Sequence, residues 1–286
     1  MSRGFAVSNR IDVKKTYKLF INGSFPRSES GRTYEVKTFK GAFLANPCLA
    51  SRKDLREAVV AARAAHNGWS KATAYNRGQI LYRIAEMLQG RTSEFIEEIM
   101  VTTGVTKVKA EKEVLQAVDT LVWYAGWSDK ISSLTGSNNP VAGPFYNFTI
   151  PESMGVVAAV APESPSLLGL IECIAPIITS GNTVIILAST KAPLSAMSFA
   201  EVLATSDLPA GVVNILTGKK EEIAPWMASH MDIDAMDISG LSTKLIAEIK
   251  VAGAENLKKV HSFKNAAPAR ITAFTESKTI WHTIGV

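Results

Sequence analysis

This 286-residue sequence contains two cysteines and four histidines, side chains that could act as nucleophiles, bases or metal ligands. Cys48 and Cys173 lie far apart in the chain and form neither a metal-ligand spacing nor a disulfide framework. The histidines are equally isolated from one another: His66, His230, His261 and His282. The sequence therefore predicts no metal site, and two unpaired cysteines indicate a reduced, intracellular setting.

A cysteine nucleophile has to be a thiolate, which requires a nearby base or positive charge. Cys173 falls in the middle of an apolar stretch, 165–179, where a buried cysteine behaves as a small hydrophobe with a raised pKa. Cys48 falls in a loop-like stretch, which predicts some exposure, but no base stands beside it. His261 lies on a predicted strand, which favours a structural role. We predict no catalytic residue among these.

Charge patterning excludes other classes of function. The net charge is +5, but the basic residues are dispersed and form no clustered face for nucleic acid. The pairs Glu97-Glu98 and Glu221-Glu222 are interpreted as solvated helix faces or favourable dipole positions. No apolar run approaches the ~20 residues of a membrane span, and the N-terminus has no signal-peptide core. These features predict a cytoplasmic protein with no membrane or nucleic-acid partner.

The first half of the chain is predicted to be mainly helical. Residues 1–16 read as a flexible polar tail, and Tyr17–Phe25 as two short strands around an Asn22-Gly23 turn. Ser51 is a suitable N-cap for a helix from Arg52 to about Trp69. Further helices are predicted over 75–89, 91–101 and 107–131, and irregular structure over 26–50 and 132–144. The last helix is predicted to bury Val114, Leu115, Val118, Leu121 and Val122.

From Met154 onward, short apolar strands alternate with helices. The strands are predicted at 155–161, 183–187, 212–216, 233–238 and 256–262. The helices between them are predicted at 165–179, 193–205, 219–230 and 241–251. Strands of this kind, alternating with helices of this length, indicate a parallel sheet covered on both faces. The fold class is therefore α/β, with one doubly wound domain of about five strands.

Three segments occur in an order and spacing that point to a family. They are Gly181–Val184 (GNTV), Ala192–Ala196 (APLSA) and Leu208–Gly218 (LPAGVVNILTG). Together with Leu19–Gly23 (LFING), they resemble consecutive signatures of the aldehyde dehydrogenase superfamily. The similarity runs from about residue 17 to about residue 262. The resemblance implies a Rossmann-like sheet with N-terminal helices and a small β flap.

The resemblance also implies a chemistry: a cysteine nucleophile, an amide that stabilises the oxyanion, a glutamate that activates water, and NAD or NADP as hydride acceptor. The matching positions here carry other residues. The amide position is Ser164, the ribose-binding lysine and glutamate fall on Leu187 and Thr190, and the glutamate base falls on Phe263. Leu241 and Leu245 replace a serine and a glycine where phosphate would bind.

We therefore predict no catalytic residue and no confident cofactor-binding residue. Ser164, Ser189 and Gly240 are predicted to be a vestigial surface. No cofactor is expected, and NAD or NADP would bind only if that surface still functions. No cysteine follows Cys173, so the catalytic domain is expected to be absent.

The resemblance divides the chain into three parts after the tail. Residues 17–136 and 151–264 are expected to form the nucleotide-binding domain, and 137–150 with 265–286 the flap that makes oligomers. Extended structure is predicted over 266–273 and 278–285, with 278–284 beside 145–150. The chain resembles the truncated, non-catalytic second domain of two-domain (family-sixteen-like) members.

Three functions follow, in order of preference. The first is a pseudoenzyme subunit that pairs with a full-length aldehyde dehydrogenase, or with itself, through an exposed flap edge. The flap residues expected to make this contact are Phe145, Phe148, Ile280 and Trp281. The second is a module that binds a nucleotide or acyl carrier. The third is an active oxidoreductase dependent on NAD or NADP.

Overall fold

The computed structural model describes residues 14–264 and 267–285 of the chain. The first thirteen residues of the predicted tail lie outside these ranges. A parallel sheet of five strands forms the centre, with the strand order β7-β6-β5-β8-β9. Its strands are β5 (Val156–Val160), β6 (Thr183–Leu187), β7 (Val213–Leu216), β8 (Ala235–Asp237) and β9 (Lys259–His261). The predicted doubly wound α/β fold is confirmed.

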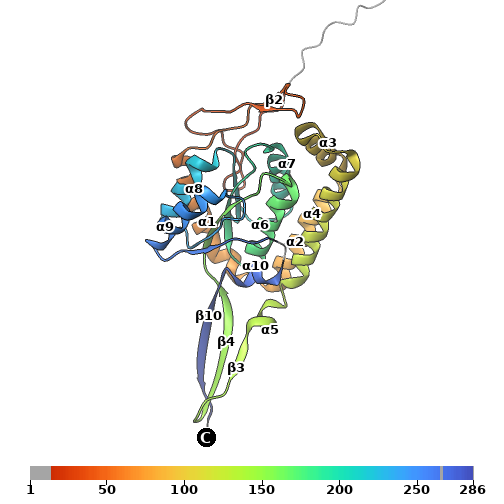
Figure 1. Cartoon of the computed structure of the whole chain (residues 1–286). Helices are drawn as coiled ribbons and strands as arrows, with labels where there is room; N and C mark the ends of the chain where they lie inside the picture. The colour runs from red at the N-terminus through yellow and green to blue at the C-terminus, as the bar shows by residue number, and fades with distance from the viewer. Residues whose placement is uncertain (1–13, 265–266, 286) are drawn as a thin grey trace, which may run out of the picture.

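Alternation along each strand sends side chains to two separate cores. Val157 and Ala159 of β5 face one core, whereas Val156, Ala158 and Val160 face the other. The first face carries α6 (Ser166–Thr179), α7 (Leu194–Ala204), α2 (Ala74–Gln89), α3 (Thr92–Thr103) and α4 (Lys107–Trp127). The second face carries α1 (Arg52–Lys71), α8 (Lys220–Ser229) and α9 (Thr243–Ala254). Figure 1 shows the two helical layers on opposite sides of the sheet.

The first helix begins where the sequence predicts. Ser51 accepts a hydrogen bond from the backbone N–H of Asp54, and the Asp54 carboxylate accepts from the backbone N–H of Ser51. This reciprocal capping box satisfies two amide groups that a helix end would otherwise leave unpaired. Trp69 then links α1 to α6, because its indole N–H donates to the Ile178 carbonyl at 2.9 Å.

Four local predictions are wrong. Residues 26–50 include a small hairpin of β1 (Val36–Lys37) and β2 (Phe43–Ala45), and 132–144 include α5 (Ile131–Thr135) and β3 (Ser137–Asn139). Leu115 and Val122 are exposed, because α4 packs on only one narrow stripe. Residues 268–272 form the short helix α10 (Pro268–Thr272) rather than an extended segment.

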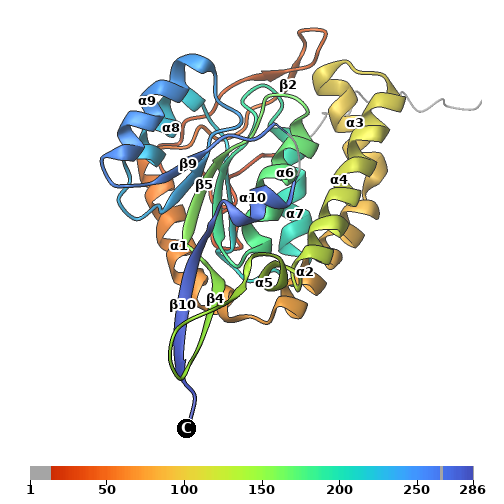
Figure 2. The ribbon, with the colours of Figure 1, turned by 60° about the horizontal axis from the view of Figure 1, so that its bottom comes forward.

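A three-stranded antiparallel flap extends from one end of the sheet domain (Figure 2). Its strand order is β10-β4-β3, with β4 (Phe145–Ser153) in the middle and β10 (Thr275–Thr283) at an edge. The two long strands pair continuously from Thr275↔Ser153 to Thr283↔Phe145. The predicted pairing of the C-terminal strand with 145–150 is confirmed for the paired residues. Between β9 and β10 the chain runs only through 262–274, and α10 within this stretch packs against α6.

Glu98 departs from the solvated position predicted for it. Ser198 donates a hydrogen bond to Glu98 Oε1 at 2.7 Å, whereas Oε2 is buried and has no partner within the described part of the chain. Burial raises the pKa of Glu98, and the charges of Glu94 and Glu201 raise it further, against the opposing effects of Ser198 and Lys15. The carboxylate form of Glu98 is therefore disfavoured in the folded state.

A raised folded-state pKa of Glu98 has a defined effect on stability. The folded state holds the proton more tightly, so the stabilisation is full below the unfolded pKa and is lost as pH rises through the folded pKa. We expect Glu98→Gln to raise the melting temperature at pH 7 by roughly 2–4 °C, the shift that about 1 kcal/mol gives in a domain of 150–250 residues. At pH 4 the variant and the parent should melt together. The matched control is the neighbouring exposed Glu97→Gln, which should show no such pH dependence; equal behaviour of the two variants would contradict the assignment.

No helix in residues 14–264 and 267–285 is long and apolar enough to cross a membrane.

Candidate functional site at the carboxyl ends of the strands

A doubly wound sheet binds ligands outside the carboxyl ends of its strands, where the strand order reverses. In this chain the reversal lies between β5, the central strand, and β8, which pairs directly with it. The segments that follow these strands and β6 carry the three residues predicted as a vestigial surface. Ser164 follows β5 and is exposed, Ser189 follows β6 and is buried, and Gly240 follows β8 and is half-buried.

A charged pair fills the space between these segments. The Lys220 Nζ lies 2.7 Å from Glu163 Oε1, and the side chains are 7% and 33% exposed. The same Nζ donates to the carbonyl of Ala161 at 2.7 Å and to the carbonyl of Gly240 at 3.0 Å. Lys220 is the first residue of α8, so a helix from the second layer reaches across the ends of β5 and β8.

The Glu163 carboxylate is held from three sides. Besides Lys220, it accepts hydrogen bonds from the Ser189 hydroxyl at 2.8 Å and from the backbone N–H of Lys191 at 3.0 Å. Burial raises the pKa of Glu163, but the hydrogen bonds from Lys220, Lys191 and Ser189 outweigh burial, and the net pKa lies below the usual value. Ser189 is thus occupied by a neighbouring side chain of the same protein.

The backbone at the end of β5 lies close against Gly240. Its N–H donates to the Val160 carbonyl at 2.9 Å. A Cβ at this position would lie 2.1 Å from the Ala161 oxygen and 2.4 Å from the Val160 oxygen. The packing of the β8 turn against the end of β5 therefore requires glycine without any ligand.

We expect Gly240→Ala to lower the free energy of unfolding by about 1–3 kcal/mol, the range for inserting an extra carbon into a filled site. Chemical denaturation followed by circular dichroism measures this change. The control is Gly126→Ala in α4, where an added Cβ meets nothing within 4 Å and alanine is the better helix former. Unchanged stability of Gly240→Ala would show that the turn relaxes freely.

A second buried pair lies at the end of β8. The Asp237 and Arg270 side chains are 0% and 2% exposed, and Arg270 Nη2 lies 2.8 Å from Asp237 Oδ2. Ser239 donates to Asp237 Oδ1 through both its backbone N–H and its hydroxyl. The guanidinium also lies 3.7 Å from the Glu172 carboxylate and 5.0 Å from the Phe263 ring centroid. Arg270 belongs to α10, so this short helix closes one side of the crevice.

The sequence analysis predicts neither the Lys220–Glu163 pair nor the Asp237–Arg270 pair. A signal for the second was present: Asp237 interrupts the apolar run Ile233–Ile238, and a buried carboxylate requires a cationic or hydrogen-bonding partner. Nothing in the local pattern indicated that Arg270 would be that partner.

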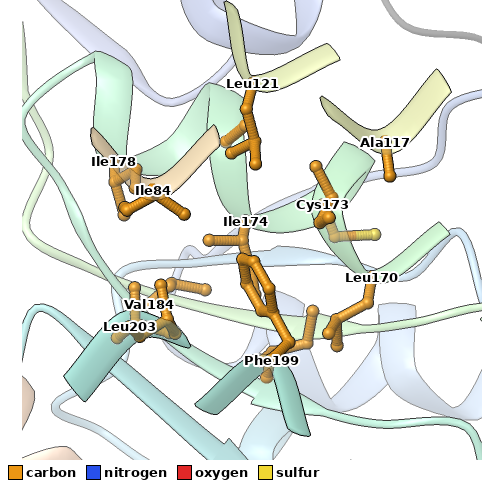
Figure 3. Close-up of a cluster of buried hydrophobic side chains, with 14 of the residues drawn as sticks. Ile84, Ala117, Leu121, Leu170, Cys173, Ile174, Ile178, Val184, Phe199 and Leu203 are labelled. Carbon is orange, nitrogen blue, oxygen red and sulfur yellow. The ribbon is translucent and has the colours of Figure 1, made fainter. Parts of the chain in front are cut away.

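The cysteines are both buried. Cys173 packs among Ala117, Leu170 and Ile174 (Figure 3), and burial raises the pKa of its thiol, with the nearby Asp237 charge raising it further. A thiol in this setting is not a nucleophile. The prediction that Cys48 is exposed is wrong, because its loop packs against the second core.

His261 lies in an aromatic cluster. Its ring stacks on Phe263 at 5.9 Å and meets Phe274 edge-on at 5.6 Å between centroids. Burial lowers the pKa of His261, and the charge of Lys259 lowers it further, which favours the neutral ring. These contacts account for His261 as a packing residue. Within residues 14–264 and 267–285 no group of three or more metal-ligating side chains is gathered.

The residues at the strand ends do not fit a dinucleotide. A pyrophosphate needs open backbone N–H groups and positive charge at the switch point. Here the Glu163 carboxylate faces that space, and Lys220 is already bound to three acceptors. Leu187 is fully buried in the second core, Leu245 is buried, and Leu241 packs against the same core.

The sheet order and its switch point define a doubly wound α/β domain of the dinucleotide-binding type, here extended by an antiparallel flap. The sequence profile of the Aldehyde dehydrogenase family matches residues 25–263, and the chain belongs to this family of oxidoreductases. The resemblance predicted from the three signature segments is confirmed.

Individual relatives show how much of the family architecture is present. The chain is 34% identical over 259 residues to a cytosolic 10-formyltetrahydrofolate dehydrogenase of Xenopus laevis, covering 88% of this chain and 28% of that protein. It is 35% identical over 257 residues to retinal dehydrogenase 2 of Gallus gallus, covering 87% of this chain and 48% of that protein.

Among solved structures, PnpE from Pseudomonas sp. WBC-3 superposes with a TM-score of 0.83 at 28% identity, covering 87% of this chain and 50% of that one. PnpE has also been solved in complex with nicotinamide adenine dinucleotide. The chain thus spans about a quarter to a half of the length of the relatives it matches.

Proposed function

We propose that this chain acts as a non-catalytic member of the aldehyde dehydrogenase family and serves as a partner subunit. The first support is chemical. Neither cysteine is available as a nucleophile, because both are buried. The three positions expected to bind cofactor offer no built site either. Ser164 is exposed, Ser189 donates its hydroxyl to Glu163, and Gly240 is packed against the backbone of β5.

The observation that carries the proposal is the edge of the flap. β10 is nine residues long and pairs along its whole length with β4 on one side. An edge strand presents unpaired backbone N–H and C=O groups that can accept a strand from another chain. The partner of this proposal is a full-length aldehyde dehydrogenase subunit or a second copy of this chain.

Aromatic side chains supply a place for such a partner to anchor. Trp281 is 61% exposed, and its ring meets Phe145 edge-on at a centroid distance of 5.8 Å. Phe148 and Ile280 face each other in register across β4 and β10 and are half-buried. Tryptophan and other large aromatics dominate the binding energy of protein interfaces.

The test is affinity capture of the chain from its native source, with identification of the retained proteins. We expect an aldehyde dehydrogenase subunit in the captured fraction, or a dimer of the chain alone by sedimentation. A purified monomer that retains neither would contradict the proposal. Aldehyde oxidation by the purified chain with NAD or NADP would contradict the non-catalytic role.

A further inference from the structure

The Lys220–Glu163 pair has the properties of a built-in ligand. A lysine ammonium has three donors and no acceptor. At Lys220 these donors meet three oxygens: the Ala161 carbonyl, the Gly240 carbonyl and Glu163 Oε1. All three oxygens belong to the segments that leave β5 and β8, the strands that flank the switch point.

The network around the pair joins the segments that follow β5, β6 and β8. Glu163 ties the β5 segment to the β6 segment through Ser189 and the Lys191 amide. Tyr34 lies near it on the N-terminal segment, where its hydroxyl is buried and has no hydrogen-bond partner in the ranges the structure covers. Burial raises the pKa of Tyr34, and the charge of Glu163 raises it further.

We propose that Lys220 and Glu163 form an internal lock at the switch point. In this lock the Lys220 ammonium takes the place of a bound ligand, and the oxygens around it form a cradle for a primary alkylammonium group. The crevice of the folded chain is closed to an anionic nucleotide, because the Lys220 ammonium, which could otherwise bind a phosphate, is already paired with Glu163 and two carbonyl oxygens. The chain then folds and remains stable without any cofactor. This inference is independent of the flap and of any partner.

The cradle can be emptied and refilled. Lys220→Ala removes the three terminal methylenes and the ammonium, a fragment that matches n-propylammonium. We expect the variant to melt roughly 4–8 °C below the parent, because Glu163 and two carbonyls lose their donor. Millimolar n-propylammonium chloride should recover about 2–4 °C of that loss in a saturable manner. Two neutral analogues of similar size, n-butane in saturated buffer and n-propanol, should recover none of the lost melting temperature.

The matched control is the adjacent Lys219→Ala. Lys219 is 56% exposed and lies 3.9 Å from Glu222, so its loss should change the melting temperature little and n-propylammonium should have no effect. Equal melting of the Lys220→Ala and Lys219→Ala variants would overturn the lock. Equal recovery by n-propanol would also overturn it, because filled volume rather than the ammonium would then be the cause.

A measurement on the unmodified protein keeps the inference testable if Lys220→Ala fails to fold. Brief acetylation of native protein with acetic anhydride, read by peptide mass spectrometry, should label Lys220 at least tenfold more slowly than Lys219. Comparable labelling of the two lysines would overturn the lock. A saturable melting shift of the unmodified chain with NAD or ADP-ribose would overturn the closed crevice, and it would leave the flap proposal standing.

Discussion

Arg270→Met is expected to lower the free energy of unfolding by about 3–5 kcal/mol, the cost of leaving one partner of a buried ion pair uncompensated. Asp237 is 0% exposed and has Arg270 as its cationic partner at 2.8 Å. Without the guanidinium, the buried carboxylate keeps the two Ser239 donors but loses its cationic partner, which costs stability. Urea unfolding followed by circular dichroism measures the loss.

Two further variants decide whether the loss belongs to the pair. Asp237→Asn combined with Arg270→Met should recover part of the stability, because no charge is then left buried. The control is Lys278→Met, which breaks the Lys278–Glu152 pair at the same 2.8 Å distance but with side chains 55% and 47% exposed. Exposed pairs contribute about 0–1 kcal/mol. If Arg270→Met and Lys278→Met lose the same amount, the buried pair is not a structural element.

Trp281→Glu is expected to weaken retention of the partner by about thirtyfold or more, which corresponds to the 2 kcal/mol of an interface hot spot. The substitution places a charge where an aromatic anchor contacts Phe145 at the flap edge. The melting temperature should change little, because the flap extends away from the two cores (Figure 1). Quantitative capture with purified partner measures the effect.

Tyr82→Glu is the control for this variant. Tyr82 is a similarly exposed aromatic residue, but it lies on α2 within the helical layer, away from the flap. Its substitution should leave partner retention unchanged. Loss of retention with Tyr82→Glu and not with Trp281→Glu would place the interface on the α2 face and reject the flap.

The sheet was predictable because its strands are short runs with buried side chains on both faces. Val156–Val160 and Thr183–Leu187 are buried at every position, and such runs between helices leave little choice of topology. Helix α10 was not predictable, since a segment of five residues starting at Pro268 shows no helical periodicity. The buried face of α4 was overestimated for the opposite reason, because Leu115 and Val122 fit the period of the buried residues but lie at the edges of the stripe.

The charges at the strand ends were beyond local reasoning for a different reason. Lys220 contacts the carbonyl of Ala161, 59 positions away in the chain, and Arg270 contacts Asp237, 33 positions away. Neither contact follows from a motif, because it depends on which strands are neighbours and on how α8 and α10 are oriented. The family signatures placed Ser189 and Gly240 at the crevice. They do not predict that Ser189 donates to the Glu163 carboxylate or that Gly240 packs against the backbone of β5.

The wide sequence separation of the two flap strands sets the order of assembly. Lys278 and Glu152, which are paired across β10 and β4, are 126 positions apart, and every strand of the parallel sheet lies between them. Closing a loop of that length costs entropy until the intervening chain is compact. The flap edge therefore forms late in folding, after the sheet has brought its ends together. The proposed partner, if it recognises β10, is therefore expected to bind chains that have finished folding rather than nascent or damaged ones.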